Sequence, residues 1–569
     1  MNNFRILRSI APALLTAGFS ILVAGLSVLS TGCKSGPSSA ENAPGAAGTA
    51  PGRPIVSQNY DDLLPLWKEF REFQKPKVPA GVPDYTAAAM AVQKSRVKEF
   101  QDRLAAIDPK GWPIPKRVDY EIVRAEMNGL EFDHRVLRPW SRMPGFYAVI
   151  QTSESDVPLR EGPEIHGVLN LWQFAFPLDE ASRTVVREKL AAIPAILAQA
   201  KANLVEDTAD LWLLGIRQKR EESADLENLG KRLAAMHPDL VPLIEQAKAA
   251  VDEFRGRLED RHKTMKGPSG IGVAEFDRSQ KNIHLVPYTW AEQLRIAERE
   301  LERSLAYLEL EKRRNASLPP LRLAADLAEL QRRQKEAVTY FFDFLRKREI
   351  FTVPDYMRLN DEVRSFAPPE RRDYFTQVTY RDPLPLLCHS VHWLEKQREK
   401  LNTHPVRGTP LLYNIWDSRA EGFATAFEEM MLGAGLFDKN PRARELVLNL
   451  LAFRAIRAIA DLKLHSREWT VEDAIQYAVK TTPYGWVLPD GATIWGDMSI
   501  YLSQPGYGTS YVVGKIQVDK LLADYSRMKG YDAGLKPFLD ELFAKGLIPQ
   551  SLLRWEMTGL DDEMKILGR

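Results

Sequence analysis

Apolar residues recur every three to four positions along most of the chain, a spacing that places them on one face of an α-helix. The pattern starts near Tyr60 and is clearest in the first segment, which carries Leu63, Leu66, Trp67, Phe70 and Phe73. No window shows the sustained alternation that is typical of strands, and only 147–152 has the character of a short strand. The sequence therefore predicts a mostly α fold, arranged as one large lobe or as two lobes.

Local signals place several helix boundaries. Thr289 and Glu292 have the spacing of a capping box, so a long helix is expected from 290 to about 315, and a second from 321 to 348. Both are charged and periodic enough to form a paired scaffold hairpin. Further on, 485–508 is rich in glycine and aromatic residues, which favours a loop.

The N-terminus has the order of a secretory signal. Arg5 and Arg8 precede an apolar run from Ile10 to Leu29, and the small residues after it end at Cys33. A cysteine in that place resembles a bacterial lipobox, which implies cleavage before Cys33 and lipid attachment to its thiol. Lys34 follows, which favours the outer membrane with the protein facing the periplasm. An uncleaved anchor helix is the alternative, because the run is close to the ~20 residues that span a bilayer.

Composition limits what the remainder can do. We expect a signal peptide at 1–32, a flexible tether at 33–55 that is rich in Ser, Gly, Ala and Pro, an N-terminal helical scaffold at 56–380, and a C-terminal helical region with the candidate site at 381–569. The formal charge of +1 gives no electrostatic reason to expect nucleic acid. Cys388 is the only cysteine besides Cys33, so the fold depends on packing; Cys388 is either a small buried hydrophobe or a nucleophile.

Residues with metal-ligand chemistry concentrate between 383 and 431. His389 and His392 are three residues apart on an expected helix, and Glu421 lies on the next helix. Two histidines and one carboxylate are a ligand set of catalytic zinc sites, so we expect His389, His392 and Glu421 to hold zinc. The usual H-E-x-x-H motif is absent, because Ser390 follows His389.

Four other residues are candidates for catalysis. Glu395 and Glu428 could accept a proton, and Tyr511 and His465 could stabilise an oxyanion. Each candidate also has a structural interpretation. The two histidines could belong to the core, and Ser418 with Glu421 could form a capping box. Glu395 and Glu428 could be solvated, Tyr511 could be packed, and His465 could stabilise the end of its helix.

Several motifs resemble those of a bacterial family of helical lipoproteins and secreted proteins that is classified as a domain of unknown function and looks related to zinc carboxypeptidases and oligopeptidases. The matching elements are Glu421-Gly422-Phe423-Ala424, an Arg-containing helix with Arg454 and Arg457, Leu464-His465 with Trp469-Thr470, and Pro505-Gly506 with Tyr511. The resemblance covers about 383–520. It implies a helical fold with a central cleft, a zinc ion and a peptide-like substrate.

The first motif of that family, His-Glu-x-x-Pro-Gly-His-His, is not preserved. If its last histidine is His392, its first histidine and glutamate fall on Pro385 and Leu386. The standard general base is then missing. The leading hypothesis is a lipid-anchored, metal-dependent envelope hydrolase that acts on peptides. The alternatives are an inactive relative that binds peptides or an envelope partner, and a hydrolase that uses Cys388, Ser418 or Ser510.

Overall fold

The computed structural model describes residues 57–153 and 167–569. The chain divides into two units, Met1–Gly52 and Arg53–Arg569, and all described residues belong to the second. The predicted signal peptide and the whole predicted tether, including Cys33, lie outside the described residues. Among those that are described, no helix is both long enough and apolar enough to cross a membrane.

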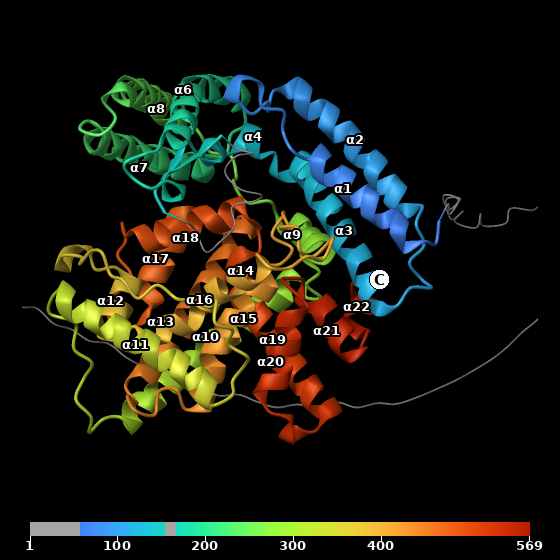
Figure 1. Cartoon of the computed structure of the whole chain (residues 1–569), viewed down its shortest axis with the longest axis vertical. Coiled ribbons are helices and arrows are strands. Elements are labelled where there is room, and N and C mark those ends of the chain that lie inside the picture. The colour runs from blue at the N-terminus through green and yellow to red at the C-terminus, as the bar shows by residue number, and fades with distance from the viewer. Residues whose placement is uncertain (1–56, 154–166) are drawn as a thin grey trace, which may run out of the picture. The chain divides into compact units, whose positions relative to one another are not determined.

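Helices dominate the described chain, as predicted (Figure 1). The first three are α1 (Leu63–Phe73), α2 (Ala87–Ala105) and α3 (Ile114–Phe132), with α4 (Pro139–Arg142) after them. The apolar stripe of α1 is buried because it packs on α2 and α3. A parallel pair of two-residue strands, β1 (Ile150–Gln151) and β2 (Leu169–Asn170), is the only sheet in the described residues, and β1 falls within the short strand expected at 147–152.

The described residues form two large hydrophobic cores and a third, small cluster of Ala324, Leu330 and Tyr380. The smaller of the two large cores lies among α6 (Glu180–Asn203), α7 (Ala209–Leu233) and α8 (Val241–His262). The larger combines α1–α3 with most of the later helices, so it includes residues from both the 56–380 and the 381–569 regions. Its centre is α16 (Ala443–Ser466), which is buried on nearly all sides. A helix that is apolar around most of its circumference is typical of such a central position.

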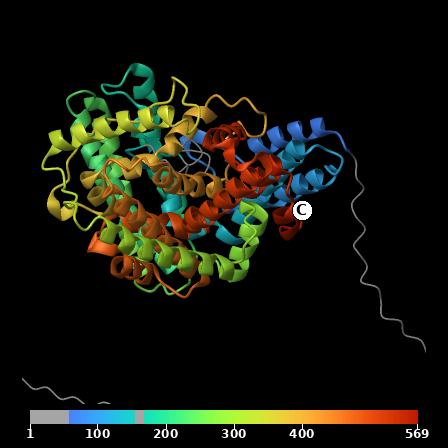
Figure 2. The same cartoon turned by 90° about the horizontal axis from the view of Figure 1, so that it is seen from below.

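Three long helices pack on one another beside α16. These are α10 (Trp290–Arg314), α15 (Asp417–Ala434) and α19 (Tyr507–Lys529), and Figure 2 shows the same bundle from below. The capping box of Thr289 and Glu292 is present, which confirms the predicted start of α10. The expected hairpin with the next helix, α11 (Leu327–Lys347), is wrong. Helix α10 packs mainly on α16 and α19, whereas α11 packs on α13, because the apolar stripes of α10 and α11 serve different neighbours.

Shorter helices complete the structure. They are α9 (Val273–Ser279), α12 (Tyr374–Arg381), α13 (Leu384–His389), α14 (Val391–Glu399), α17 (Val471–Thr481), α18 (Ala492–Ser503), α20 (Leu535–Ala544), α21 (Gln550–Thr558) and α22 (Asp562–Ile566). Helix α18 corrects the loop that was expected over 485–508. Its buried residues Ile494, Met498, Tyr501 and Leu502 follow helical spacing and pack on α16, α17 and α19, so tertiary burial outweighs the local glycine and aromatic content.

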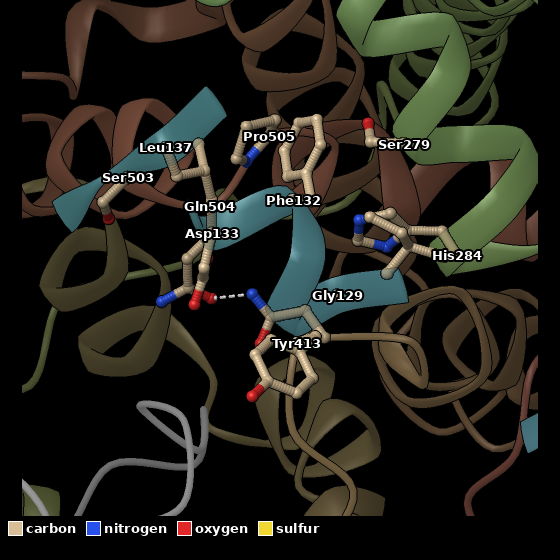
Figure 3. A pocket seen from close by; sticks show the side chains of 12 residues that line it. Gly129, Phe132, Asp133, Leu137, Ser279, His284, Tyr413, Ser503, Gln504 and Pro505 are labelled. Atoms are coloured by element: carbon tan, nitrogen blue, oxygen red, sulfur yellow. Dashed lines mark hydrogen bonds between the residues drawn. The ribbon is translucent and has the colours of Figure 1, made fainter. Parts of the chain in front are cut away.

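A small cavity is lined in part by the residues that precede α15 and α19 (Figure 3). Its volume is about 30 Å³, room for about two water molecules and not for a peptide. Two π-helical turns, Asp133–Leu137 and Gln280–His284, contribute to its wall. So do Tyr413 and Asn414, which are consecutive left-handed residues with φ of 42° and 56°. The Asn414 side-chain amide donates to Oε1 of Gln504 across 2.6 Å. This hydrogen bond joins the segment before α15 to the segment before α19.

The closest backbone approach in this bundle joins α15 to α19. A Cβ atom added to Gly422 would lie 2.3 Å from the Cα atom of Gly514, and one added to Gly514 would lie 2.1 Å from the carbonyl oxygen of Ser418. Both distances are too short for any side chain. The two glycines therefore fix how close α15 and α19 can come.

Gly422→Ala tests this contact. Because the added methyl group meets backbone rather than a flexible side chain, we expect the free energy of unfolding to fall by about 1–3 kcal/mol. Urea titration followed by circular dichroism measures the loss. Gly433→Ala on the same helix is the matched control, because nothing lies within 4 Å of its added Cβ; it should be neutral or stabilising by up to about 1 kcal/mol. Equal effects of the two substitutions would contradict the packing argument.

Candidate metal site

His389 and His392 lie on two short helices rather than on one. Helix α13 ends at His389 and α14 begins at Val391, with Ser390 between them at φ −65° and ψ 3°. The predicted single helix is therefore wrong. The break turns the two rings toward a common point, with centroids 4.8 Å apart and planes at 87°.

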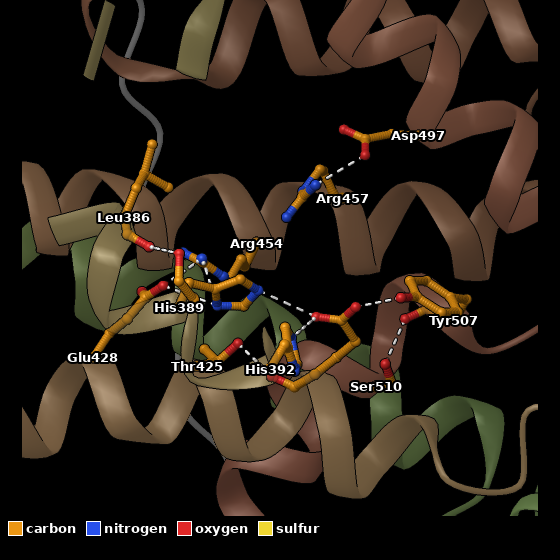
Figure 4. Close-up of polar contacts among 12 residues, drawn as sticks. Leu386, His389, His392, Thr425, Glu428, Arg454, Arg457, Asp497, Tyr507 and Ser510 are labelled. Carbon is orange, nitrogen blue, oxygen red and sulfur yellow. Dashed lines mark hydrogen bonds and ion pairs between the residues drawn. The ribbon is translucent and has the colours of Figure 1, made fainter. Parts of the chain in front are cut away.

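Glu421 occupies that common point. Its Oε2 lies 3.2 Å from Nε2 of His389 and 2.9 Å from Nε2 of His392 (Figure 4). One ligand atom from each residue can be chosen so that all three lie within 4.8 Å of one another. In the ranges 57–153 and 167–569, no other group of three or more histidine, cysteine or acidic residues meets that criterion. The structure thus brings together the three residues that the sequence predicts as metal ligands.

The start of α15 removes the capping interpretation of Glu421. The helix begins at Asp417 and its N-cap is Trp416, which has no side chain able to cap. Ser418 lies inside the helix, so Ser418 and Glu421 do not form a capping box. The Glu421 side chain is free to turn toward the histidines, and its residue is only 2 % exposed.

A second layer of polar groups holds the cluster in place. The Glu428 Oε1 atom lies 3.0 Å from Nδ1 of His389, and the Arg454 guanidinium donates to the same oxygen. The hydroxyl of Tyr507 donates to Oε1 of Glu421. Arg454 Nη2 also lies 3.1 Å from Nδ1 of His389, so Glu428 and Arg454 together hold this imidazole in place.

The charges in the cluster reinforce these contacts. Burial by itself would raise the pKa of Glu421, but attraction to His392 and hydrogen bonds from both imidazoles hold that pKa well below its usual value. Burial, together with the negative charge of Glu421, raises the pKa of Tyr507 well above its usual value. Tyr507 therefore keeps its proton and acts as the donor.

Two of the four predicted catalytic residues have arginine partners. Glu428 is fully buried between Arg454 and His389, as described above. Glu395 is buried beside Arg419, whose Nη1 donates to Oε2 across 3.1 Å and whose Nη2 donates to Oε1. Neither glutamate is a solvated helix charge.

Tyr511 and His465 have different surroundings. The Tyr511 ring lies 6.0 Å from the His389 ring and nearly parallel to it, so Tyr511 borders the cluster. His465 is fully buried near the end of α16, where Nε2 lies 2.9 Å from the carbonyl oxygen of Tyr501 and Nδ1 accepts from the backbone N–H of Ile271. These contacts suit a neutral imidazole that joins three segments, apart from the three predicted ligands.

Sequence reasoning missed two buried acids and a tyrosine. Asp461 accepts hydrogen bonds from the backbone N–H groups of Gly506 and Thr509 and so binds the start of α19. Asp417, one turn before Glu421, has no hydrogen-bond partner for either carboxyl oxygen among the described residues. Burial, together with the charge of Glu421, raises the pKa of Asp417 well above its usual value. Tyr507 precedes Tyr511 by four residues, a same-face spacing that could have drawn attention to it.

Two of the three residues of the third hypothesis, Cys388 and Ser510, have other contacts. Cys388 is completely buried and its Sγ contacts the carbonyl oxygen of Leu384. Burial raises the pKa of this thiol well above its usual value, which disfavours the nucleophilic thiolate. The Ser510 hydroxyl donates to the Tyr507 carbonyl across 2.6 Å. The geometry favours a small hydrophobic role for Cys388.

The helical fold of this chain is similar to that of known proteins. Residues 396–557 match the family described as "Bacterial protein of unknown function (DUF885)", a match that includes Glu421, Arg454 and Tyr507 but begins after the two histidines. Among curated proteins, none matches this chain significantly.

Two solved structures share the fold. One is described as a "putative lipoprotein of unknown function" from Shewanella oneidensis, with 17 % identity, a TM-score of 0.63 and coverage of 87 % of this chain and 97 % of that one. The other, a "putative lipoprotein" from Colwellia psychrerythraea, has 14 % identity, a TM-score of 0.60 and coverage of 88 % and 98 %. At these identities the similarity extends to the fold alone.

The pKa of buried His465 predicts a loss of stability in acid. Burial lowers this pKa from 6.5 to about 4, so the unfolded chain binds a proton more readily than the folded protein between those values. The stabilisation is therefore complete above pH 6.5 and is lost as the pH falls toward 4, by at most about 3 kcal/mol. In His465→Gln, unfolding free energies measured from pH 7 to pH 4 should fall less steeply than in the wild type. An unchanged slope would contradict this assignment.

Proposed function

We propose that His389, His392 and Glu421 bind a zinc ion, and that the protein is a lipid-anchored hydrolase of the cell envelope that cleaves peptides. The observation that carries the proposal is the convergence of both imidazole Nε2 atoms on one oxygen of Glu421. Two nitrogens and one carboxylate oxygen are a recurrent ligand set of catalytic zinc sites, in which a fourth position serves the reaction.

The surroundings of the three side chains support a metal. Metal-binding histidines usually donate their other ring N–H to a carboxylate, and Glu428 is placed to accept from Nδ1 of His389. Tyr507 occupies Oε1 of Glu421 and so leaves Oε2 as the ligand oxygen.

The chemistry follows from these positions. When bound, zinc supplies a Lewis acid that activates water and polarises a carbonyl group. Glu428 and Arg454 keep the imidazole of His389 in one orientation and one tautomer. Tyr511 lies beside that imidazole and is the candidate to donate a hydrogen bond to a substrate oxygen.

The location is inferred from the N-terminus and the similar structures. The run that ends at Cys33 resembles a lipobox, and both solved structures of the same fold are described as lipoproteins. We infer that Cys33 carries the lipid and that the helical unit faces the periplasm from the outer membrane.

One observation favours a second function, peptide binding without hydrolysis. The motif lacks the usual glutamate after its first histidine, and the two carboxylates that could replace it are paired with arginines. A paired carboxylate accepts a proton less readily than a free one. The two functions differ in turnover, not in metal content.

Metal content tests the ligand set. Protein that lacks residues 1–32 should contain about one equivalent of zinc by elemental analysis. His392→Ala and Glu421→Ala should remove it, because each deletes one of three ligands. His404→Ala is the matched control, since this histidine is partly exposed, contacts Asp119 and lies outside the cluster; it should keep the metal. Metal-free wild-type protein after incubation with zinc would refute the site.

Hydrolysis separates the two functions. A mixture of unstructured peptides, analysed by mass spectrometry, should be cleaved by the wild type, and His392→Ala should be slower by at least about 100-fold. The His404→Ala control should retain the rate. A zinc-loaded protein that binds peptides by fluorescence anisotropy but leaves them intact would establish the binding function instead.

A further inference from the structure

Arg457 is a buried guanidinium beside the candidate metal site. It lies on α16, one turn after Phe453, and is 3 % exposed. Its Nη1 donates to Oδ1 of Asp497 on α18 across 2.9 Å. Its charged group also lies over two aromatic rings, with Cζ 4.7 Å from the centroids of both Phe453 and Tyr511. These contacts hold the guanidinium in one orientation.

One edge of this guanidinium is not used by the described protein. Nε is buried and has no hydrogen-bond partner, and no described residue bonds to Nη2. A buried donor without a partner destabilises the protein, because it has lost its hydrogen bonds to water. The Nε–Nη2 edge of arginine matches the two oxygens of a carboxylate, which it binds through two parallel hydrogen bonds.

The Nε–Nη2 edge of Arg457 lies on the side of the candidate metal site. Figure 4 shows the tip of Arg457 pointing from α16 toward the His389 imidazole, with Asp497 on its other side. Tyr511 connects the two, because its ring lies under Cζ of Arg457 and is stacked 6.0 Å from the ring of His389. The side chains of His389 and Asp497, which lie on either side of Arg457, are 15 % and 13 % exposed.

We infer that Arg457 binds a carboxylate group of the substrate. The protein then prefers peptides that have a carboxylate close to the peptide bond that is cleaved at the metal site. The inference takes the peptide substrate from the proposed function, on which it rests. It adds the chemical group, a carboxylate, by which the protein selects among peptides. The carboxylate can come from a free peptide C-terminus or from an Asp or Glu side chain. Arg457 would be a specificity residue, because it touches the substrate and not the metal ligands.

Three peptides of one sequence distinguish the sources. The first has a free C-terminus, the second a C-terminal amide, and the third a C-terminal amide with Asp in place of the last residue. Zinc-loaded wild-type protein should bind and cleave at least one acidic peptide about 10- to 100-fold better than the neutral one, the range expected for a charge-assisted pair. The preferred acid identifies the source.

The variants Arg457→Gln and Arg457→Lys test the residue. Arg457→Gln should abolish the preference, and Arg457→Lys should keep part of it, while zinc content stays at the wild-type level in both. Arg554→Lys is the matched control. It alters another buried arginine, on α21, whose Nε lies 2.7 Å from Oδ2 of Asp524, and it should leave the preference unchanged.

Each outcome decides one point. Equal binding and cleavage of the three peptides, or a preference that survives Arg457→Gln, would overturn the inference and leave the hydrolase intact. If no peptide is cleaved, the hydrolase proposal fails, and anisotropy still tests Arg457. A preference in binding that depends on Arg457 would then support the carboxylate site, and its absence would reject it.

Discussion

The burial of the Glu421 carboxylate is the constraint on which the rest of the site depends. A carboxylate removed from water is stable only if cationic or hydrogen-bonding groups surround it. Here two imidazoles and a tyrosine hydroxyl do so, from three separate segments of the chain. The imidazoles and hydroxyl must arrive at fixed distances, so the packing of α14, α15 and α19 is as much a part of the site as the side chains are.

That packing depends on small residues and on one buried acid. Gly422 and Gly514 let the backbones of α15 and α19 nearly touch, which brings Tyr507 within reach of Glu421. Asp461 binds the first backbone N–H groups of α19 and thereby sets where that helix starts. Burial raises the pKa of Asp461 to about 8, so this anchoring acid favours its neutral form in the folded protein. The helix start is thus determined by a buried group on α16.

The sequence predicted what local chemistry determines. Helical periodicity gave the fold class, and the capping box at Thr289 located one helix start correctly. The types and spacing of His389, His392 and Glu421 were enough to predict that the three side chains meet. The break at Ser390 was missed, because nothing in its sequence neighbourhood excludes a continuous helix; it arises from how α13 and α14 pack.

The residues that contact His389 and Glu421 could not be predicted from the neighbouring sequence, for a different reason. Arg454 contacts His389 from 65 residues away, and Tyr507 contacts Glu421 from 86 residues away. Such contacts follow from tertiary packing, and only the resemblance to a family drew attention to Arg454. Helix α18 was mistaken for a loop on similar grounds, since burial against α16 and α19 decides its conformation.

The convergence of two histidines that are only three residues apart has one physical explanation. On a continuous helix, residues three apart are neighbours on one face but their rings project along diverging directions. Ending α13 at His389 and starting α14 after Ser390 changes those directions, and the rings become nearly perpendicular while both Nε2 atoms face Glu421. A helix break therefore lets histidines three residues apart converge on one carboxylate. Ser390 at the break does not join them, because its hydroxyl donates to the Leu386 carbonyl.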